Sequence, residues 1–168
     1  CNATRLIHQG HIEAAGLIAC IYIWGQGVAV DYSRAMVAYK VCAEAGDAVC
    51  QHQLGFMYRN GCGVDVDYAQ ALAWFEKAAA KGHAGAQYGI GIVNYKKERY
   101  EEAVTWFTKA AAQGDTDAEV HLGDCYRKGR GVTRDIPKAI EWYTKAAEKV
   151  DTEAAESLRE LTQLAAST

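Results

Sequence analysis

Residues 126–143, YRKGRGVTRDIPKAIEWY, decide the fold because closely related segments occur twice more in the chain. YRNGCGVDVDYAQALAWF begins at Tyr58 and YIWGQGVAVDYSRAMVAY begins at Tyr22, 36 residues earlier. A further copy, NYKKERYEEAVTWF from Asn94, lacks the glycine-rich loop and is four residues shorter. Self-similarity at such a period predicts stacked supersecondary units, each too small to bury its apolar face alone.

Each repeat has the pattern of two helices. Apolar residues fall at helical spacing in a first helix, helix A, as at Cys50, Leu54 and Tyr58, and in a second helix, helix B, as at Ala71 and Phe75. Glycines follow both helices at short intervals, so neighbouring helices must run antiparallel. The sequence therefore predicts an all-α fold, a right-handed α/α superhelix of antiparallel helix pairs. We expect the repeated aromatic pairs of helix B to pack between helices.

The repeat period sets the expected boundaries. Gly46 and Gly82, which end successive B helices, are 36 residues apart, as Gly10 and Gly46 are, so the first residues align with the end of an earlier helix B. We therefore expect the chain to be part of a longer array. The expected segments are 1–10, the end of a preceding partial repeat; 11–47, repeat one; 48–83, repeat two; 84–115, the short repeat three; 116–151, repeat four; and 152–168, a capping helix and tail.

The pattern A-x-x-x-L-G-x-x-Y-x-x-G-x-G-V-x-x-D-x-x-K-A-x-x-W-Y-x-K-A-A resembles the Sel-1-like repeat, from about residue 12 to the C-terminus. Repeat three departs from it, because its loop at residues 96–100 is instead similar to that of a tetratricopeptide repeat. The resemblance implies a non-catalytic scaffold that binds other proteins. Repeat four carries the pattern at Ala118, Leu122, Gly123, Tyr126, Gly129, Gly131, Val132, Asp135, Lys138, Ala139, Trp142, Tyr143, Lys145, Ala146 and Ala147.

Two classes of partner are disfavoured by composition. The formal net charge is -3 and the pI is near 6.0, which offers no broad attraction to phosphate backbones, so we expect no nucleic-acid partner. No apolar run reaches the roughly 18 to 20 residues needed to span a bilayer, so we expect no membrane insertion. The expected partner is another protein or a peptide segment.

The residues that support catalysis or metal binding are sparse. The three serines, Ser33, Ser157 and Ser167, occur in no Ser-x-x-Lys or G-x-S-x-G motif. Cys50 and His52 are two apart but supply no four-ligand zinc pattern. We therefore predict no catalytic residues, no metal site and no cofactor. The alternatives are a penicillin-binding or β-lactamase-like hydrolase, which cysteine-rich relatives imply, and a purely structural spacer in a larger assembly.

The C-x7-C segment formed by Cys42 and Cys50 spans the end of a helix B and the start of the next helix A. It resembles the bridged turns of cysteine-rich secreted members of the family. Two free, buried thiols are the alternative. A bridge would favour a periplasmic or secreted location, and free thiols would favour a cytoplasmic one.

Helix phase selects the expected binding surface. If Leu54, Gly55 and Tyr58 pack against the neighbouring helices, the positions on the other side of helix A face the concave surface of the stack. Repeat proteins bind their partners on that surface. Those positions carry aromatic groups with a basic rim, the composition of a binding hot spot. The predicted partner-binding residues are Trp24, His52, Phe56, Arg59, Tyr88, Ile92, Tyr95, Arg127 and Lys128.

Overall fold

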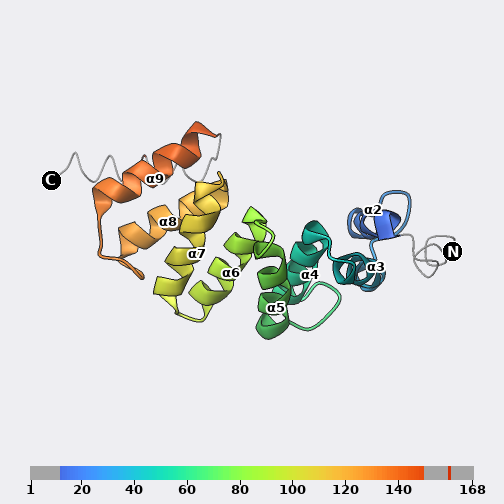
Figure 1. Cartoon of the computed structure of the whole chain (residues 1–168). Helices are drawn as coiled ribbons and strands as arrows, with labels where there is room; N and C mark the ends of the chain where they lie inside the picture. The colour runs from blue at the N-terminus through green and yellow to red at the C-terminus, as the bar shows by residue number, and fades with distance from the viewer. Residues whose placement is uncertain (1–11, 150–158, 160–168) are drawn as a thin grey trace. The chain divides into compact units, whose positions relative to one another are not determined.

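A computed structural model describes residues 12–149 and 159, and these residues form eight α-helices and no strand (Figure 1). This confirms the predicted all-helical repeat fold. The partial repeat expected at 1–10 and the capping helix expected near 153–164 lie outside the described residues. In chain order the helices are α2 (Ile12–Trp24), α3 (Tyr32–Glu44), α4 (Ala48–Asn60), α5 (Tyr68–Ala79), α6 (Ala84–Lys96), α7 (Tyr100–Ala112), α8 (Thr116–Lys128) and α9 (Ile136–Glu148).

Aspartates set the starts of most helices. A carboxylate at the N-cap accepts an N–H that the first turn would otherwise leave unpaired. Helix α7 has no such cap: Arg99 makes no capping bond, and Glu101 and Glu102 instead place negative charge in the first turn. The capping residues are Asp31, Asp47, Asp67, Asp115 and Asp135.

The loop glycines supply the left-handed backbone that ends helix A. Gly61 and Gly129 follow α4 and α8 with φ of 73° and 69°, a conformation that disfavours a side chain. In repeat three Glu98 takes this conformation, with φ of 60°, and is the one non-glycine among the described residues to do so. A single left-handed residue is therefore enough for the shorter link from α6 to α7.

The chain forms two compact units, residues 1–89 and 90–168. In the first, consecutive helices α2 to α5 pack on one another around buried residues that include Tyr39, Leu54 and Met57. In the second, α7 packs on α8 and α8 on α9, with Tyr143 and Val120 among the buried residues. The apolar core thus lies along the helix joints and not at a single centre.

Glycines in the A helices make room for the aromatic rings of the B helices. A Cβ added to Gly55 would lie 2.5 Å from Phe75 Cδ1, and one added to Gly89 would lie 2.7 Å from Phe75 Cζ. Phe75 is fully buried, so its ring is held between the backbones of α4 and α6. The same contact recurs in the second unit, where Gly91 faces Phe107 and Gly123 faces Tyr143.

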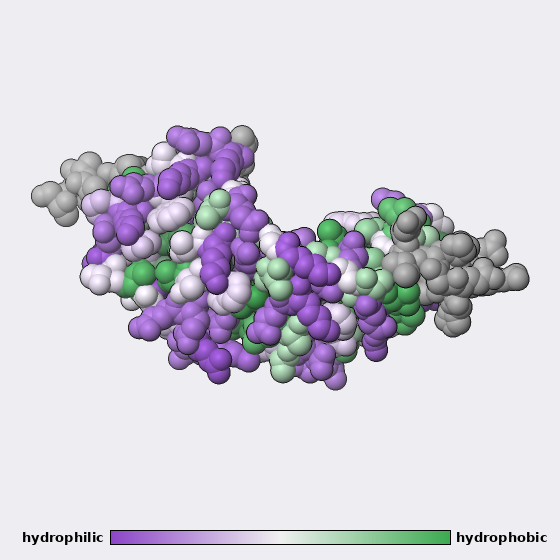
Figure 2. All heavy atoms as spheres, in the orientation of Figure 1, coloured by the Kyte–Doolittle hydropathy of each residue, from purple (hydrophilic) through white to green (hydrophobic). Residues whose placement is uncertain are grey.

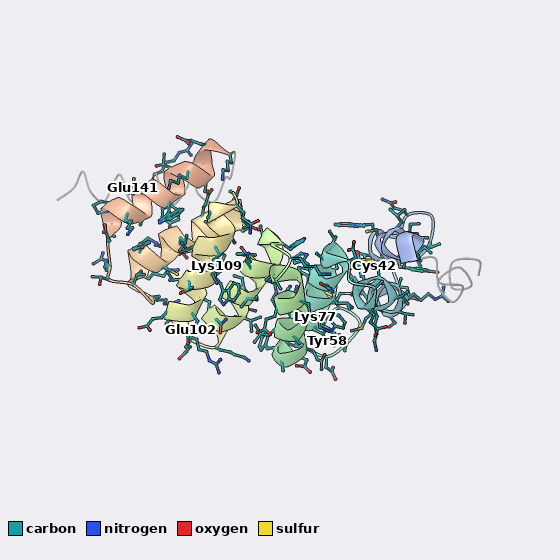
Figure 3. All side chains as sticks on the ribbon, viewed as in Figure 1. Cys42, Tyr58, Lys77, Glu102, Lys109 and Glu141 are labelled. Carbon is teal, nitrogen blue, oxygen red and sulfur yellow. A yellow bond between two sulfur atoms is a disulfide. The ribbon has the colours of Figure 1, made fainter. Side chains whose placement is uncertain are left out.

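The outer faces of the B helices are solvated. Three of the B helices, α5, α7 and α9, carry a lysine one turn after a tryptophan, with the ammonium above the indole ring; Figure 3 labels Lys77 and Lys109. The ammonium lies 3.8 Å from the ring centre of Trp74 in α5 and 4.1 Å from that of Trp106 in α7. These lysines cover part of the indole rings with their apolar stems while their ammonium groups stay in water.

Candidate functional site

The first unit contains a groove between helices α2 and α4, hereafter the α2–α4 groove. It comprises two cavities of about 540 and 380 Å³ that share Cys20, Tyr39 and Gln53 in their walls. Three of the predicted partner-binding residues meet in the larger cavity. They are Trp24 from the end of α2, with His52 and Phe56 from the middle of α4.

The walls of the α2–α4 groove are apolar and open to solvent. Trp24 is 74% exposed and Phe56 39%; Leu17 and Val49, which line the smaller cavity, are 70% and 54% exposed. Among the described residues, every exposed large hydrophobic side chain lies between positions 17 and 66. In Figure 2 the hydrophobic residues gather over α2, whereas α9 is mainly hydrophilic. The strongly exposed large hydrophobic side chains of the described residues therefore all lie in the first unit.

The floor of the groove is rigidly built. Tyr39 is almost fully buried, and its hydroxyl lies 3.4 Å from Cys20 Sγ. Burial, together with the neighbouring Cys20, raises the pKa of Tyr39, which keeps the phenol neutral. A disulfide joins Cys42 of α3 to Cys50 of α4, with their Cα atoms 5.8 Å apart (Figure 3 labels Cys42). A covalent link and buried side chains thus support the exposed walls.

A cation lies beside the larger cavity. The Arg59 guanidinium is 5.2 Å from the ring centre of Phe56 and 5.9 Å from that of Phe75. Burial lowers the pKa of Arg59, which indicates partial desolvation. No carboxylate of the described residues forms an ion pair with Arg59. The groove therefore combines apolar walls with an arginine that has no acidic partner in the described chain.

His52 is neutral at the groove wall. Its ring stacks on His83 with centres 4.7 Å apart, and it tilts against Phe75 at 5.8 Å. Burial, with electrostatic interactions with His83 and Arg59, lowers the pKa of His52 to about 4. This histidine therefore acts as a flat, uncharged surface near neutral pH. Its partner His83 is 31 positions away, a pairing that no local motif indicates.

The other predicted aromatic residues are less open. Tyr88 and Ile92 are half-buried on α6, with Tyr88 close enough to Arg59 to affect its pKa. Tyr95, in the second unit, contacts the edge of Tyr100 at 5.1 Å and accepts a hydrogen bond from Arg130. Sequence reasoning missed Arg130, whose guanidinium covers both tyrosine rings.

The predicted basic residues of the second unit are internally paired. Arg127 and Lys128 contact opposite oxygens of Asp124, at 2.9 and 2.6 Å, and the Tyr143 hydroxyl donates to the same carboxylate at 2.6 Å. Burial raises the pKa of Asp124, but the hydrogen bonds from Lys128, Tyr143 and Arg127 outweigh it and lower that pKa to about 2. Asp124 therefore neutralises part of the predicted basic rim. The i+3 and i+4 spacing was the signal for these pairs.

Comparisons with known proteins agree with the helix-pair architecture. The family model described as Sel1 repeat matches residues 12–37, 48–83, 84–115 and 116–151. No curated protein matches the chain. Within the described residues, no helix has the length and apolar character needed to cross a membrane.

Two solved structures are similar in both sequence and fold. A protective antigen of uropathogenic Escherichia coli strains, with an SLR fold, is 36% identical with a TM-score of 0.82; the match covers 94% of this chain and 34% of the antigen. A Sel1 repeat protein from Oxalobacter formigenes is 30% identical with a TM-score of 0.79, over 94% of this chain and 72% of its own. The chain thus spans about a third of the length of the E. coli antigen.

Proposed function

The chain belongs to the Sel1 repeat family, whose members are generally protein-interaction scaffolds, and on this premise we propose that its α2–α4 groove binds an apolar segment of another protein. Family membership supports the class of function, since Sel1 repeat proteins are typically non-catalytic. The observation that carries the proposal is the open groove, in which Trp24 and Phe56 border one cavity of about 540 Å³. Large aromatic groups at a concave surface are the usual anchors of protein interfaces.

Packing within the fold does not account for the exposure of these walls. Leu54, Met57 and Tyr39 already fill the joint beneath them and are nearly inaccessible to solvent. Exposed Trp24 and Leu17 are unfavourable in water by roughly 25 cal/mol per Å² of apolar area, which a bound segment would relieve. A segment that covers the groove would therefore gain affinity without any change in the helix pairs.

Arg59 specifies the chemistry of that segment. Its guanidinium lies over Phe56, a groove residue, and lacks an acidic partner in the described residues. We infer that the bound segment places a carboxylate next to a bulky apolar side chain. Ile92, Tyr95, Arg127 and Lys128 of the second unit are proposed as a separate, weaker contact, because Asp124 and Arg130 already engage three of the four side chains.

The hydrolase alternative gains no support from Ser33, the one serine within the described residues. This serine is exposed in the first turn of α3, and Met36 occupies the position where a Ser-x-x-Lys motif would place lysine. The spacer alternative predicts that the groove residues can be replaced without loss of any binding activity.

A peptide-display library panned against the purified chain tests the proposal. Selected peptides should carry an acidic residue beside an aromatic or branched apolar one. The Trp24→Ala/Phe56→Ala variant should keep its helix content but bind these peptides about 30-fold more weakly, since anchor residues contribute about 2 kcal/mol or more. Arg59→Glu should mainly lower the association rate, with an effect that fades as salt rises.

The matched control is Glu102→Ala/Lys109→Ala on the solvated face of α7 (both labelled in Figure 3), which should bind as the unmodified chain does. Peptides that bind the groove variant and the unmodified chain equally well would show that the α2–α4 groove is not the binding surface. A library that yields no peptide with the acidic and apolar pair would contradict the inferred role of Arg59.

A further inference from the structure

The turn between α3 and α4 gathers three side chains with metal-ligating atoms. The sulfur atoms of Cys42 and Cys50 and a carboxylate oxygen of Asp47 all lie within 4.8 Å of one another. Sequence reasoning did not find this group, because it considered Cys50 only with His52 as a metal ligand and did not consider Asp47. All three residues line the smaller cavity of the α2–α4 groove.

This turn is held in place by bonds other than the disulfide. Asp47 Oδ1 accepts from the Cys50 N–H at 2.8 Å, and the Asp47 N–H donates to the Cys42 carbonyl at 3.2 Å. Gln51 Nε2 donates to the Ala43 carbonyl at 3.0 Å, which ties the start of α4 to the end of α3. These bonds fix the backbone on both sides of the bridge. Reduction would therefore leave two thiols facing each other across an ordered turn.

There is open space beside the two sulfur atoms. Gly16 of α2 lies opposite, where an added Cβ would be 3.3 Å from Cys50 Sγ and 3.8 Å from Cys42 Sγ. Because glycine has no side chain, the sulfurs border a cavity of about 380 Å³. The cavity leaves room for a water molecule as a further ligand of a bound ion.

We propose that the reduced form of this turn binds a divalent cation of the zinc class through Cys42, Cys50 and Asp47. Two thiolates and one carboxylate match the ligand preference of Zn²⁺, which takes sulfur at about 2.3 Å and oxygen at about 2.0–2.2 Å in tetrahedral geometry. Asp47 Oδ1 caps α4, so Oδ2 is the oxygen available to the ion. Cys50 lies in the first turn of α4, where the helix dipole stabilises a thiolate.

The bridge and the ion exclude each other. A dithiol reductant passes two electrons and two protons to the Cys42–Cys50 disulfide, becomes a disulfide itself and leaves two thiols. The ion then displaces the two thiol protons to solvent as the Sγ–metal bonds form. Oxidation of the thiols would remove both sulfur ligands. The turn therefore exchanges a covalent link for a metal link according to the redox state.

Cadmium binding to the phosphine-reduced chain tests this proposal, because thiolate coordination produces an ultraviolet charge-transfer band. The starting protein carries Cys1→Ser, Cys20→Ser, Cys62→Ser and Cys125→Ala, so that only the two bridge cysteines remain. We expect one equivalent of Cd²⁺ to bind, Zn²⁺ to displace it, and the oxidised protein to show no band. Circular dichroism should show that the reduced protein keeps its helices.

Two variants of that protein identify the ligands. Cys42→Ser should weaken Cd²⁺ binding at least about 100-fold, because one thiolate is lost. Asp47→Asn keeps a good N-cap residue but removes the charge, and should weaken binding at least roughly tenfold. Three results would each overturn the three-ligand site. They are unfolding of the chain on reduction, Cd²⁺ binding no tighter than in Cys42→Ser/Cys50→Ser, and unchanged Cd²⁺ binding in Asp47→Asn.

Discussion

Replacing Gly55 with alanine should destabilise the first unit, although alanine is the better helix former. The added methyl would lie 2.5, 2.6 and 2.9 Å from three carbons of the Phe75 ring. Favourable carbon contacts lie at about 3.5–4.0 Å, so the closest overlap is about 1 Å. The ring cannot retreat, because Gly89 of α6 lies against its far side, where an added Cβ would be 2.7 Å away.

The expected magnitude follows from two opposing effects. Overpacking a filled core typically costs about 1–3 kcal/mol, and a ring enclosed on two sides belongs near the upper limit. Glycine to alanine in a helix returns about 1 kcal/mol. We therefore expect the free energy of unfolding to fall by about 1–2 kcal/mol. For a chain of this size that lowers Tm by roughly 2–8 °C.

Urea unfolding followed by helix ellipticity measures this change, with Gly16→Ala as the matched control. In α2 the added methyl would meet only Cys50 Sγ at 3.3 Å and Cys42 Sγ at 3.8 Å, so this variant should be close to neutral. Gly55→Ala/Phe75→Leu should lose less stability than the sum of its single variants, because the smaller side chain removes the overlap. Equal effects of Gly55→Ala and Gly16→Ala, or strict additivity in the double variant, would show that the Phe75 ring does not resist the added methyl group.

Three further outcomes are expected. Leu122→Ala should lower the free energy of unfolding by about 2–5 kcal/mol in a urea titration, because this side chain is fully buried; a loss below 1 kcal/mol would contradict its place in the core. The pKa of His52 is about 4 in the folded chain, against an ordinary value of 6.5. As the pH falls, the unfolded chain therefore binds a proton at this residue before the folded chain does. Stability should be complete above about pH 6.5 and fall by on the order of 3 kcal/mol toward pH 4, and a pH series of melts should show a clearly smaller loss for His52→Gln. Protein made in an oxidising compartment should show Cys42 and Cys50 protected from alkylation by intact mass, and the bridge should add about 2.5 kcal/mol in the chain-entropy model; full alkylation without reductant would show free thiols.

Local spacing was enough to predict the helices. The repeat period located each helix A and helix B, and glycines such as Gly61 indicated where α4 ends. Leu54 and Gly55 face the joint as the helix phase requires, and Phe56 faces solvent. These features depend on residues a few positions apart, which share one face of a helix whatever the rest of the chain does.

The groove needed information that spacing does not contain. Its cavities are lined by residues of α2, α3 and α4 together, and the stacking of His52 on His83 joins the start and the end of repeat two. Contacts between helices that are far apart in the sequence depend on side-chain size and charge, which the repeat period does not specify.

The contact between a B-helix ring and the residue that faces it from the next helix A also decides whether one repeat can be exchanged for another. Phe75 fits against Gly89, but the corresponding positions in the second and fourth repeats are Gln53 and His121. His121 contacts Phe107 ring to ring, at 5.2 Å between centres, and Gln53 borders the cavities beside Tyr39. Each B-helix ring is thus matched to one particular residue on the next helix A. A chimera built by duplicating repeat two would set a glutamine against Phe75, so an engineer must move a joint intact, cutting within the repeats and not between them.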